Sequence, residues 1–152
     1  MNGNTHKGKV LTETLSGYRG RQNVITYRSS WEYKAFGMMS KMHNMKAING
    51  WASEETVFKY VSPLDDKEHK YYMDLTVFKP NGDVVFIEIK PYQQTQPPNR
   101  TRNKRDDVYA REVNTFRVNT AKWKAVEEWC KKHSSPHKKF EFVKWTEREL
   151  KI

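Results

Sequence analysis

The fold of this chain is decided by residues 71–90, which read YYMDLTVFKPNGDVVFIEIK. Two runs rich in β-branched and aromatic residues, 71–78 and 84–90, flank a KPNGD segment and predict the two strands of a hairpin. Pro80 at the first turn position and Gly82 at the third suit a type I turn closed by a left-handed glycine. The sequence therefore predicts a three-residue hairpin loop between two central strands.

The predicted loop fixes which residues of the two strands face one another. It pairs Lys79 with Asp83, and counting back from this pair puts Asp74 directly opposite Glu88. Side chains alternate between the two faces of a strand, so Lys90 points to the same side as Glu88. Two carboxylates whose Cβ atoms are roughly 5 Å apart should destabilise the sheet by repulsion. A divalent cation between them would turn this repulsion into a binding site with a lysine beside it.

The same register sorts the other side chains of the hairpin into two faces. One face is wholly apolar and consists of Met73, Leu75, Val77, Val85, Ile87 and Ile89. The acids and the lysine share the other face with Tyr72, Thr76, Phe78, Val84 and Phe86. A slip of one residue would place Asp74 among apolar partners, so the pattern supports the pairing independently of function. We expect the apolar face to be core and the acids to be free to serve a site.

The composition limits the class of protein. At 152 residues the chain is long enough for one domain with a substantial core. A net charge of +10 with 13% aromatic residues indicates a polyanionic partner, nucleic acid rather than a membrane. We find no apolar run near the ~20 residues of a membrane span, and the first residues lack the apolar core of a signal peptide. The single cysteine, Cys130, excludes an internal disulfide and fits a reducing cytosol, so secretion is not expected.

The N-terminal third is expected to hold an arm followed by a helix. Residues 1–22 show no sustained periodicity, which predicts an irregular arm that is either disordered or binds a partner, ahead of a single domain over 23–152. Ser29 and Glu32 match a capping box, and apolar residues then recur at helical spacing. We therefore expect a helix over 30–43.

Strands and helices alternate over the rest of the chain. We expect a strand at 50–61, a polar loop at 92–104, helices over 106–132 broken near Asn119-Thr120, a strand at 138–145 and a final capped helix from Thr146. With the central hairpin, this order predicts an α/β or α+β fold, a small mixed sheet flanked by helices.

An aspartate on one strand and Glu-x-Lys on the next are typical of phosphodiester hydrolysis. Two carboxylates can hold Mg²⁺, with Mn²⁺ as a substitute, while waters and a substrate phosphate fill the other positions. Such a metal polarises the phosphoryl oxygen and lowers the pKa of a bound water. The lysine can position that water or stabilise charge building on the phosphate.

The order of Glu32 on a helix, Asp74 on a strand and Glu88-Ile89-Lys90 on the next strand resembles the PD-(D/E)xK nuclease superfamily. Met73 stands where the namesake motif has its proline. Six segments resemble, more specifically, the head completion nucleases of T-even-like bacteriophages: TYRSSWEYKA (26–35), WASEE (51–55), HKYYMDL (69–75), FIEIKP (86–91), QTQPP (94–98) and VNTAKW (118–123). This resemblance covers about residues 24–150 and implies a restriction-endonuclease-like core.

The resemblance also implies a role for the protein and for its residues. The role is a virion-assembly endo- or exonuclease that acts on packaged double-stranded DNA at the phage head before the tail joins. Its expected location is the virion or the assembling capsid in the host cytoplasm, and its expected partners are head and neck proteins such as the portal or connector. Asp74 and Glu88 would be metal ligands and Lys90 the catalytic lysine. Glu32 would complete or support the metal site, although its place in a capping box is a sufficient structural role.

Further candidates for DNA contacts follow the catalytic strand. Gln93 and Gln96 either contact DNA or water, or belong to a flexible loop. The basic residues after them are expected to grip phosphates without regard to base sequence. They are Arg100, Arg102, Lys104 and Arg105. Nothing in the chain reads as a base-recognition motif, so little sequence specificity is expected.

Two more acids lie on the predicted strand at 50–61. Alternation allows only one of Glu54 and Glu55 to face the site, and Glu55 is the better second candidate for a metal ligand. Two rival functions stay open beside the phage nuclease. One is a transposon-end or Holliday-junction nuclease on the same scaffold. The other is a neck or connector protein that binds DNA without cutting it, for which opposed acids would have no use.

Overall fold

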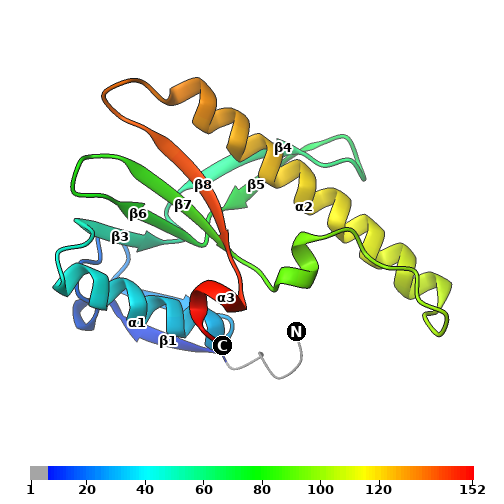
Figure 1. The fold of residues 1–152 in the computed structure, drawn as a ribbon, viewed down its shortest axis with the longest axis horizontal. Helices are drawn as coiled ribbons and strands as arrows, with labels where there is room; N and C mark the ends of the chain where they lie inside the picture. The colour runs from blue at the N-terminus through cyan, green and yellow to red at the C-terminus, as the bar shows by residue number, and fades with distance from the viewer. Residues whose placement is uncertain (1–6) are drawn as a thin grey trace.

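A computed structural model describes residues 7–152, and residues 1–6 of the expected arm lie outside the described residues (Figure 1). The centre of the fold is a four-stranded mixed sheet of order β3-β6-β7-β8. Its strands are β3 (Gly50–Ser53), β6 (Leu75–Phe78), β7 (Val84–Ile89) and β8 (Phe140–Trp145). Only the β7–β8 pair of this sheet is parallel, and the other neighbours are antiparallel.

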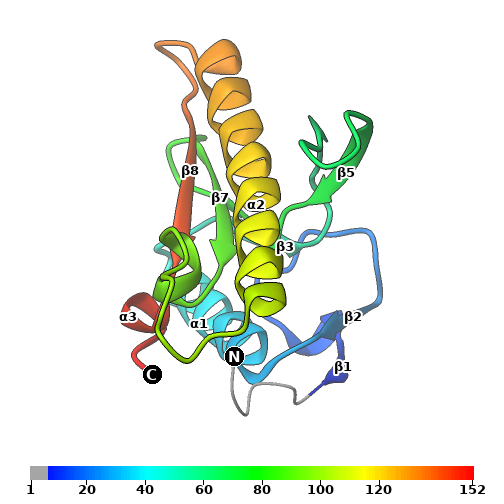
Figure 2. The same ribbon diagram turned by 90° about the vertical axis from the view of Figure 1, so that its right-hand side faces the viewer.

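Two helices cover the two faces of this sheet, α1 (Ser30–Asn44) and α2 (Asp106–His133) (Figures 1 and 2). On the α1 side, one buried cluster contains Ala35, Phe36, Met39, Leu75, Val77 and Ile87. On the α2 side, a second contains Met73, Val84, Phe86, Trp123, Val126 and Cys130. Both faces of the hairpin are therefore core. The expected apolar core face is confirmed at Leu75, Val77 and Ile87, and the acids lie at the end of the hairpin opposite its turn.

The predicted turn and register are confirmed. The Lys79 N–H donates to the Asp83 carbonyl at 2.9 Å, and Gly82 has a φ of 94° in the left-handed region that glycine tolerates. The strand pairs run from Phe78↔Val84 to Leu75↔Ile87, as counted from the turn. Continued by one residue, this register places Asp74 across from Glu88.

The strand predicted over 71–78 is two strands in two sheets. β5 (Glu68–Tyr72) pairs with β4 (Val57–Val61) in a separate ribbon, and the chain bends at Met73-Asp74 before β6 begins. Met73 consequently packs on the α2 side, not on the face of Leu75 as expected. The alternation fails here because the bend interrupts the strand.

The strand expected over 50–61 is likewise broken at its middle. Glu54 has a φ of 52°, and its N–H donates to the Met73 carbonyl at 3.2 Å. The two breaks therefore lie side by side, one on each strand. They let the β4–β5 ribbon leave the central sheet and pack against α2 (Figure 2).

The expected irregular lead-in over 1–22 contains regular structure in its described part. β1 (Gly8–Leu11) pairs antiparallel with β2 (Val24–Tyr27), with a 3₁₀ turn at Thr12–Thr14 between them. Tyr18 stands edge-on against Trp51 with ring centroids 5.0 Å apart. Strands of four residues carry too little periodicity to be recognised, so the prediction of irregular structure is wrong at β1.

The C-terminal half follows the prediction with one exception. α2 runs unbroken, so the expected break near Asn119-Thr120 is wrong: the Thr120 hydroxyl bonds back to the Phe116 carbonyl at 2.8 Å inside the helix. The loop after β7 opens with a 3₁₀ helix, Tyr92–Thr95. The final capping box is confirmed, with Thr146 capping α3 (Glu147–Leu150). In the part of the chain that the structure describes, no helix is long and apolar enough to cross a membrane.

Candidate active site

A pocket of about 300 Å³ lies where the start of α1 meets the bend before β6 and the end of β7. Its walls carry the four acids and bases singled out from the sequence: Glu32, Asp74, Glu88 and Lys90. Residues from three separate segments thus meet at the end of the central hairpin opposite its turn. Gln94, from the 3₁₀ helix after β7, closes the pocket on the side of the loop.

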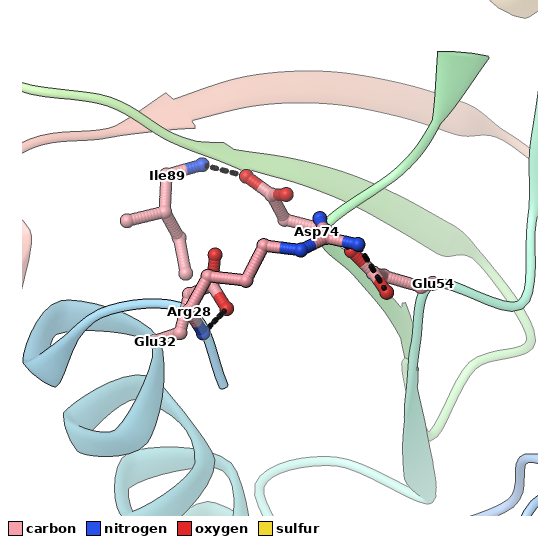
Figure 3. A network of polar contacts seen from close by, with 5 residues as sticks. All are labelled: Arg28, Glu32, Glu54, Asp74 and Ile89. Atoms are coloured by element: carbon pink, nitrogen blue, oxygen red, sulfur yellow. Dashed lines mark hydrogen bonds and ion pairs between the residues drawn. The ribbon is translucent and has the colours of Figure 1, made fainter. Parts of the chain in front are cut away.

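Asp74 is fixed by the backbone of the neighbouring strand. Its Oδ2 accepts a hydrogen bond from the Ile89 N–H at 2.7 Å (Figure 3). Burial raises the pKa of Asp74 to about 7, the Ile89 N–H opposes this shift, and the carboxylate of Glu32 adds to it. The repulsion felt by Asp74 therefore comes from Glu32 and, more weakly, from Glu54.

Glu88 is held from two sides. The buried hydroxyl of Tyr71 donates a hydrogen bond to its Oε2, and the Lys90 ammonium lies 3.5 Å from its Oε1. Burial raises the pKa of Glu88, while the charges of Lys90 and then Lys122 lower it. Glu88 is only 7% exposed, but it can keep its negative charge because positively charged lysines lie near it.

Glu32 serves both the helix and the pocket. Its own N–H is capped by the Ser29 hydroxyl at 3.3 Å, and its Oε2 accepts from the Arg28 N–H at 2.8 Å. Burial raises the pKa of Glu32, the Arg28 N–H lowers it, and the charge of Glu54 raises it further. The Ser29 cap is confirmed, but the full capping box is not formed, because Glu32 accepts from Arg28 and not from the N-cap Ser29. The Glu32 carboxylate faces Asp74 across the pocket (Figure 3).

Of the two acids at the break after β3, it is Glu54 that approaches the site. Its carboxylate pairs with the Arg28 guanidinium at 2.6 Å, as Figure 3 shows. Glu55 turns away and accepts from the Arg21 N–H. The preference for Glu55 over Glu54 is therefore wrong. The left-handed residue at Glu54 breaks the alternation on which that preference rested.

Two side chains of the site were missed by reasoning from the sequence. Tyr71 reaches Glu88 from the β4–β5 ribbon, and Lys122 reaches it from α2. The Lys122 ammonium lies 5.4 Å from the centre of the Tyr71 ring and 5.7 Å from that of Tyr60. Burial lowers the pKa of Lys122, and the charge of Glu88 raises it. Both residues lie in segments that carry the family resemblance, HKYYMDL and VNTAKW, which is the signal that could have found them.

The chemistry of these groups fits a divalent cation. A buried aspartate whose pKa is raised towards 7 gains from a neighbouring positive charge, and its Oδ1 has no hydrogen-bond partner among residues 7–152. Residues 7–152 contain no group of three or more acids, histidines or cysteines placed to hold a metal ion. Mg²⁺ needs no such cage, because it is commonly held by one or two carboxylates together with waters and phosphate.

The predicted DNA-contact residues lie beside the pocket rather than in it. Gln93 and Gln96 are exposed on the loop that follows β7. Lys104 is mostly buried, pairs with Glu112 at 2.6 Å and donates to the Asn99 carbonyl, so it braces the loop. Arg100 pairs with Asp106 and lies over the Tyr109 ring.

Arg102 and Arg105 are the more available cations of this loop. Arg105 pairs with Asp107 but remains 79% exposed, and Arg102 makes no ion pair within residues 7–152. The exposed ion pair between Arg105 and Asp107 is weak, so Arg105 can exchange it for a contact with a phosphate.

Comparison with known proteins places this chain in a family. Residues 45–141 match the family described as TnsA-like endonuclease N terminal. The chain is also 36% identical over 130 residues to the head completion nuclease of Enterobacteria phage T4, covering 84% of this chain and 85% of that protein. No solved structure matches. The match and the mixed sheet between two helices confirm the expected α+β, restriction-endonuclease-like class.

Proposed function

Because this chain belongs to the TnsA-like endonuclease family and to the phage head completion nucleases, we propose that it is a Mg²⁺-dependent deoxyribonuclease. It hydrolyses phosphodiester bonds of double-stranded DNA, by endo- or exonucleolytic cutting. One observation carries the proposal: Asp74, Glu88, Lys90 and Glu32 line the same small pocket. The mutual repulsion of Glu32 and Asp74 at the pocket wall costs stability, and a bound cation would relieve it.

The roles of the four residues follow from their contacts. Asp74 and Glu88 would hold Mg²⁺, with Glu32 completing or supporting the site. When bound, Mg²⁺, or Mn²⁺ in its place, polarises the phosphoryl oxygen and makes water a better nucleophile. The Lys90 ammonium, partly buried beside Glu88, donates hydrogen bonds to the phosphate and stabilises the charge that builds on it.

The surrounding residues keep this set in place. The Ile89 N–H orients Asp74, and the Tyr71 hydroxyl orients Glu88. Lys122 adds a second positive charge behind Glu88, which favours binding of an anionic substrate.

The loop after the pocket would hold the DNA backbone. Arg102 and Arg105 are proposed as the main phosphate contacts, with weaker contributions from Arg100 and Lys104, whose charges are already paired. Gln93 and Gln96 would contact the substrate strand next to the cut. The net charge of +10 agrees with a sequence-independent grip that weakens with salt.

The biological setting is proposed from the relative's name. The head completion nuclease of phage T4 is similar over most of both chains, so we place this protein in phage head completion, acting on packaged DNA. Its location would be the virion or the assembling capsid in the host cytoplasm, and its partners portal or connector proteins. The match to an endonuclease family favours a second candidate, a nuclease for branched or transposon-end DNA.

Cleavage by the wild-type chain and by Lys90→Ala tests the proposal. Linear, nicked and branched DNA would be incubated with Mg²⁺ or Mn²⁺ and the products resolved on gels. We expect Lys90→Ala to lower the rate about 100-fold or more, since it removes a donor aimed at developing charge. Lys79→Ala, an exposed lysine at the turn of the same hairpin, is the matched control and should cut normally.

Equal rates for the wild type and Lys90→Ala would overturn the catalytic assignment. An inactive wild type on every DNA form, with either metal, would favour the non-catalytic neck protein instead. Cutting confined to branched DNA would favour the junction nuclease.

A further inference from the structure

A second hollow adjoins the active-site pocket. It measures about 820 Å³ and lies between the segment 92–101 and the first half of α2. Gln94 lines both hollows, so the larger groove begins where the pocket ends. A DNA strand whose phosphate sits in the pocket therefore has this groove as its neighbour on one side.

The wall of the groove on α2 contains an amide that no other side chain or backbone group uses. Asn119 lines the groove, and its side chain makes no hydrogen bond with any of residues 7–152. Its amide atoms are not sealed off from solvent, so its donors and its acceptor remain available to a ligand in the groove. Lys122 lies one helical turn after Asn119 on α2 and is close enough to Glu88 to affect its pKa, so this part of α2 connects the groove to the active site.

The remaining lining has the chemistry of a nucleobase site rather than of a phosphate site. Amides are its most frequent polar side chains, and they offer the paired donors and acceptors that match base edges. They are Gln93, Gln94, Gln96, Asn99 and Asn119. Tyr92, at the mouth, is 47% exposed and presents a ring on which a base can stack. Lys104, which also lines the groove, is already neutralised by Glu112. Arg111, a cation of the lining, is already paired with Asp107 at 3.4 Å.

The size of the groove decides which form of DNA can enter it. A hollow of about 820 Å³ is too small for a paired and stacked duplex, and pairing occupies the Watson–Crick edges of the bases. An unpaired nucleotide exposes both its ring and its edge. We propose that the groove binds one or two unpaired nucleotides of the DNA strand next to the bond that is cut. This inference rests on the proposed nuclease function and adds its preferred substrate, DNA with a frayed or overhanging end.

Binding of two DNA probes to the full chain tests the proposal. Fluorescein-labelled hairpin DNA would be compared with and without a short single-stranded extension, on either strand, by anisotropy in EDTA so that nothing is cut. We expect the extension to tighten binding by about tenfold through stacking and amide contacts. Asn119→Ala should remove much of this gain while leaving affinity for the blunt hairpin unchanged. Gln93→Ala also removes a proposed contact to the substrate strand, so it should reduce the gain itself, measured as the ratio of the two affinities.

Asn114→Ala is the matched control, an exposed asparagine on the same helix outside the groove. It should keep the full gain. Gln93 is exposed, so its variant keeps the proposal testable if Asn119→Ala fails to fold. Equal affinity of the wild type for both probes would overturn the proposal that the groove binds unpaired nucleotides. So would an equal loss of the affinity gain in Asn114→Ala. That failure is distinct from failure of the nuclease, which is judged by Lys90-dependent cutting alone.

Discussion

The Tyr71 hydroxyl, carried by the two-stranded ribbon, donates a hydrogen bond to the Glu88 carboxylate of the central sheet. Both side chains are buried, and Lys90 approaches the other oxygen of Glu88. The orientation of Glu88 therefore depends on a strand that does not pair with its own. It depends in turn on the breaks at Glu54 and Met73-Asp74, because these bring the ribbon back over the site.

Tyr71→Phe is expected to weaken both the fold and metal binding. The substitution removes only the hydroxyl and leaves a buried acceptor without one partner, at a cost of about 1–3 kcal/mol. Glu88 then has greater freedom to turn away from the pocket. The Mg²⁺ concentration for half-maximal cutting should rise about tenfold, with a smaller change of the rate at saturation.

A thermal-shift titration with Mg²⁺ gives the same answer without turnover and should show the same loss of affinity. Tyr72→Phe is the matched control, since Tyr72 is the next residue on β5 and is exposed. Identical metal titrations for Tyr71→Phe and the wild type would mean that the hydroxyl does not orient Glu88.

Asp74→Asn should stabilise the metal-free protein at neutral to alkaline pH. The folded pKa of Asp74 is about 7, above its ordinary value of 3.8, so the folded state binds the proton more tightly than the unfolded state. The stability from that proton is full below about pH 4 and is lost as the pH rises through 7. Asparagine remains neutral and can still accept from the Ile89 N–H.

Thermal unfolding in EDTA checks this prediction. Near pH 8 the variant should exceed the wild type by about 1 kcal/mol or more, and the difference should shrink towards pH 4. Added Mg²⁺ should raise the melting temperature of the wild type and not that of Asp74→Asn. A lower metal-free stability of the variant at every pH would instead assign Asp74 a structural role.

Glu32→Gln should lower metal-dependent cutting about tenfold or more while the helix remains folded. A glutamine oxygen can still accept from the Arg28 N–H, so the cap survives and only the charge facing Asp74 is lost. Glu55→Gln is the control, because Glu55 bonds to the Arg21 N–H away from the pocket. Circular dichroism would verify folding. Similar effects of the two substitutions would leave Glu32 with its capping role alone.

Removing Arg102 and Arg105 together should weaken DNA binding and reduce its salt dependence. Each phosphate contact contributes about 0.9 to the slope of log affinity against log salt, so the slope should fall by about 2. Fluorescence anisotropy over a range of salt measures it. A double alanine variant of Lys41 and Lys46, at the far end of α1, controls for the loss of net charge. An unchanged slope would place the phosphate grip elsewhere.

The sequence predicted well what local geometry determines. The turn at 79–83 sets the register of β6 and β7, and that register with the helix start at Ser29 brings Glu32, Asp74 and Lys90 to one pocket. It failed where the backbone leaves its regular course. Nothing local announces the left-handed Glu54 or the bend at Met73-Asp74, so Glu55 was preferred to Glu54 and the face of Met73 was misassigned.

Contacts between distant segments were invisible for a different reason. Tyr71 and Lys122 meet Glu88 only because the ribbon and α2 pack on the same face of the sheet. Periodicity reports which face of an element is apolar, and it does not report which other element covers that face. A polar residue on such a face is therefore assigned a partner only once the packing is known.

The unbroken course of α2 has a consequence for how this protein can vary. Each residue of a helix advances the side chains by about 100° around its axis, so inserting or deleting one residue between Lys122 and Val126 would rotate everything on one side relative to the other. Val126 is fixed in the core, and Asn119 and Lys122 would swing away from the substrate. Related chains should therefore keep a constant spacing across this segment and change length instead in the loop before Asp106.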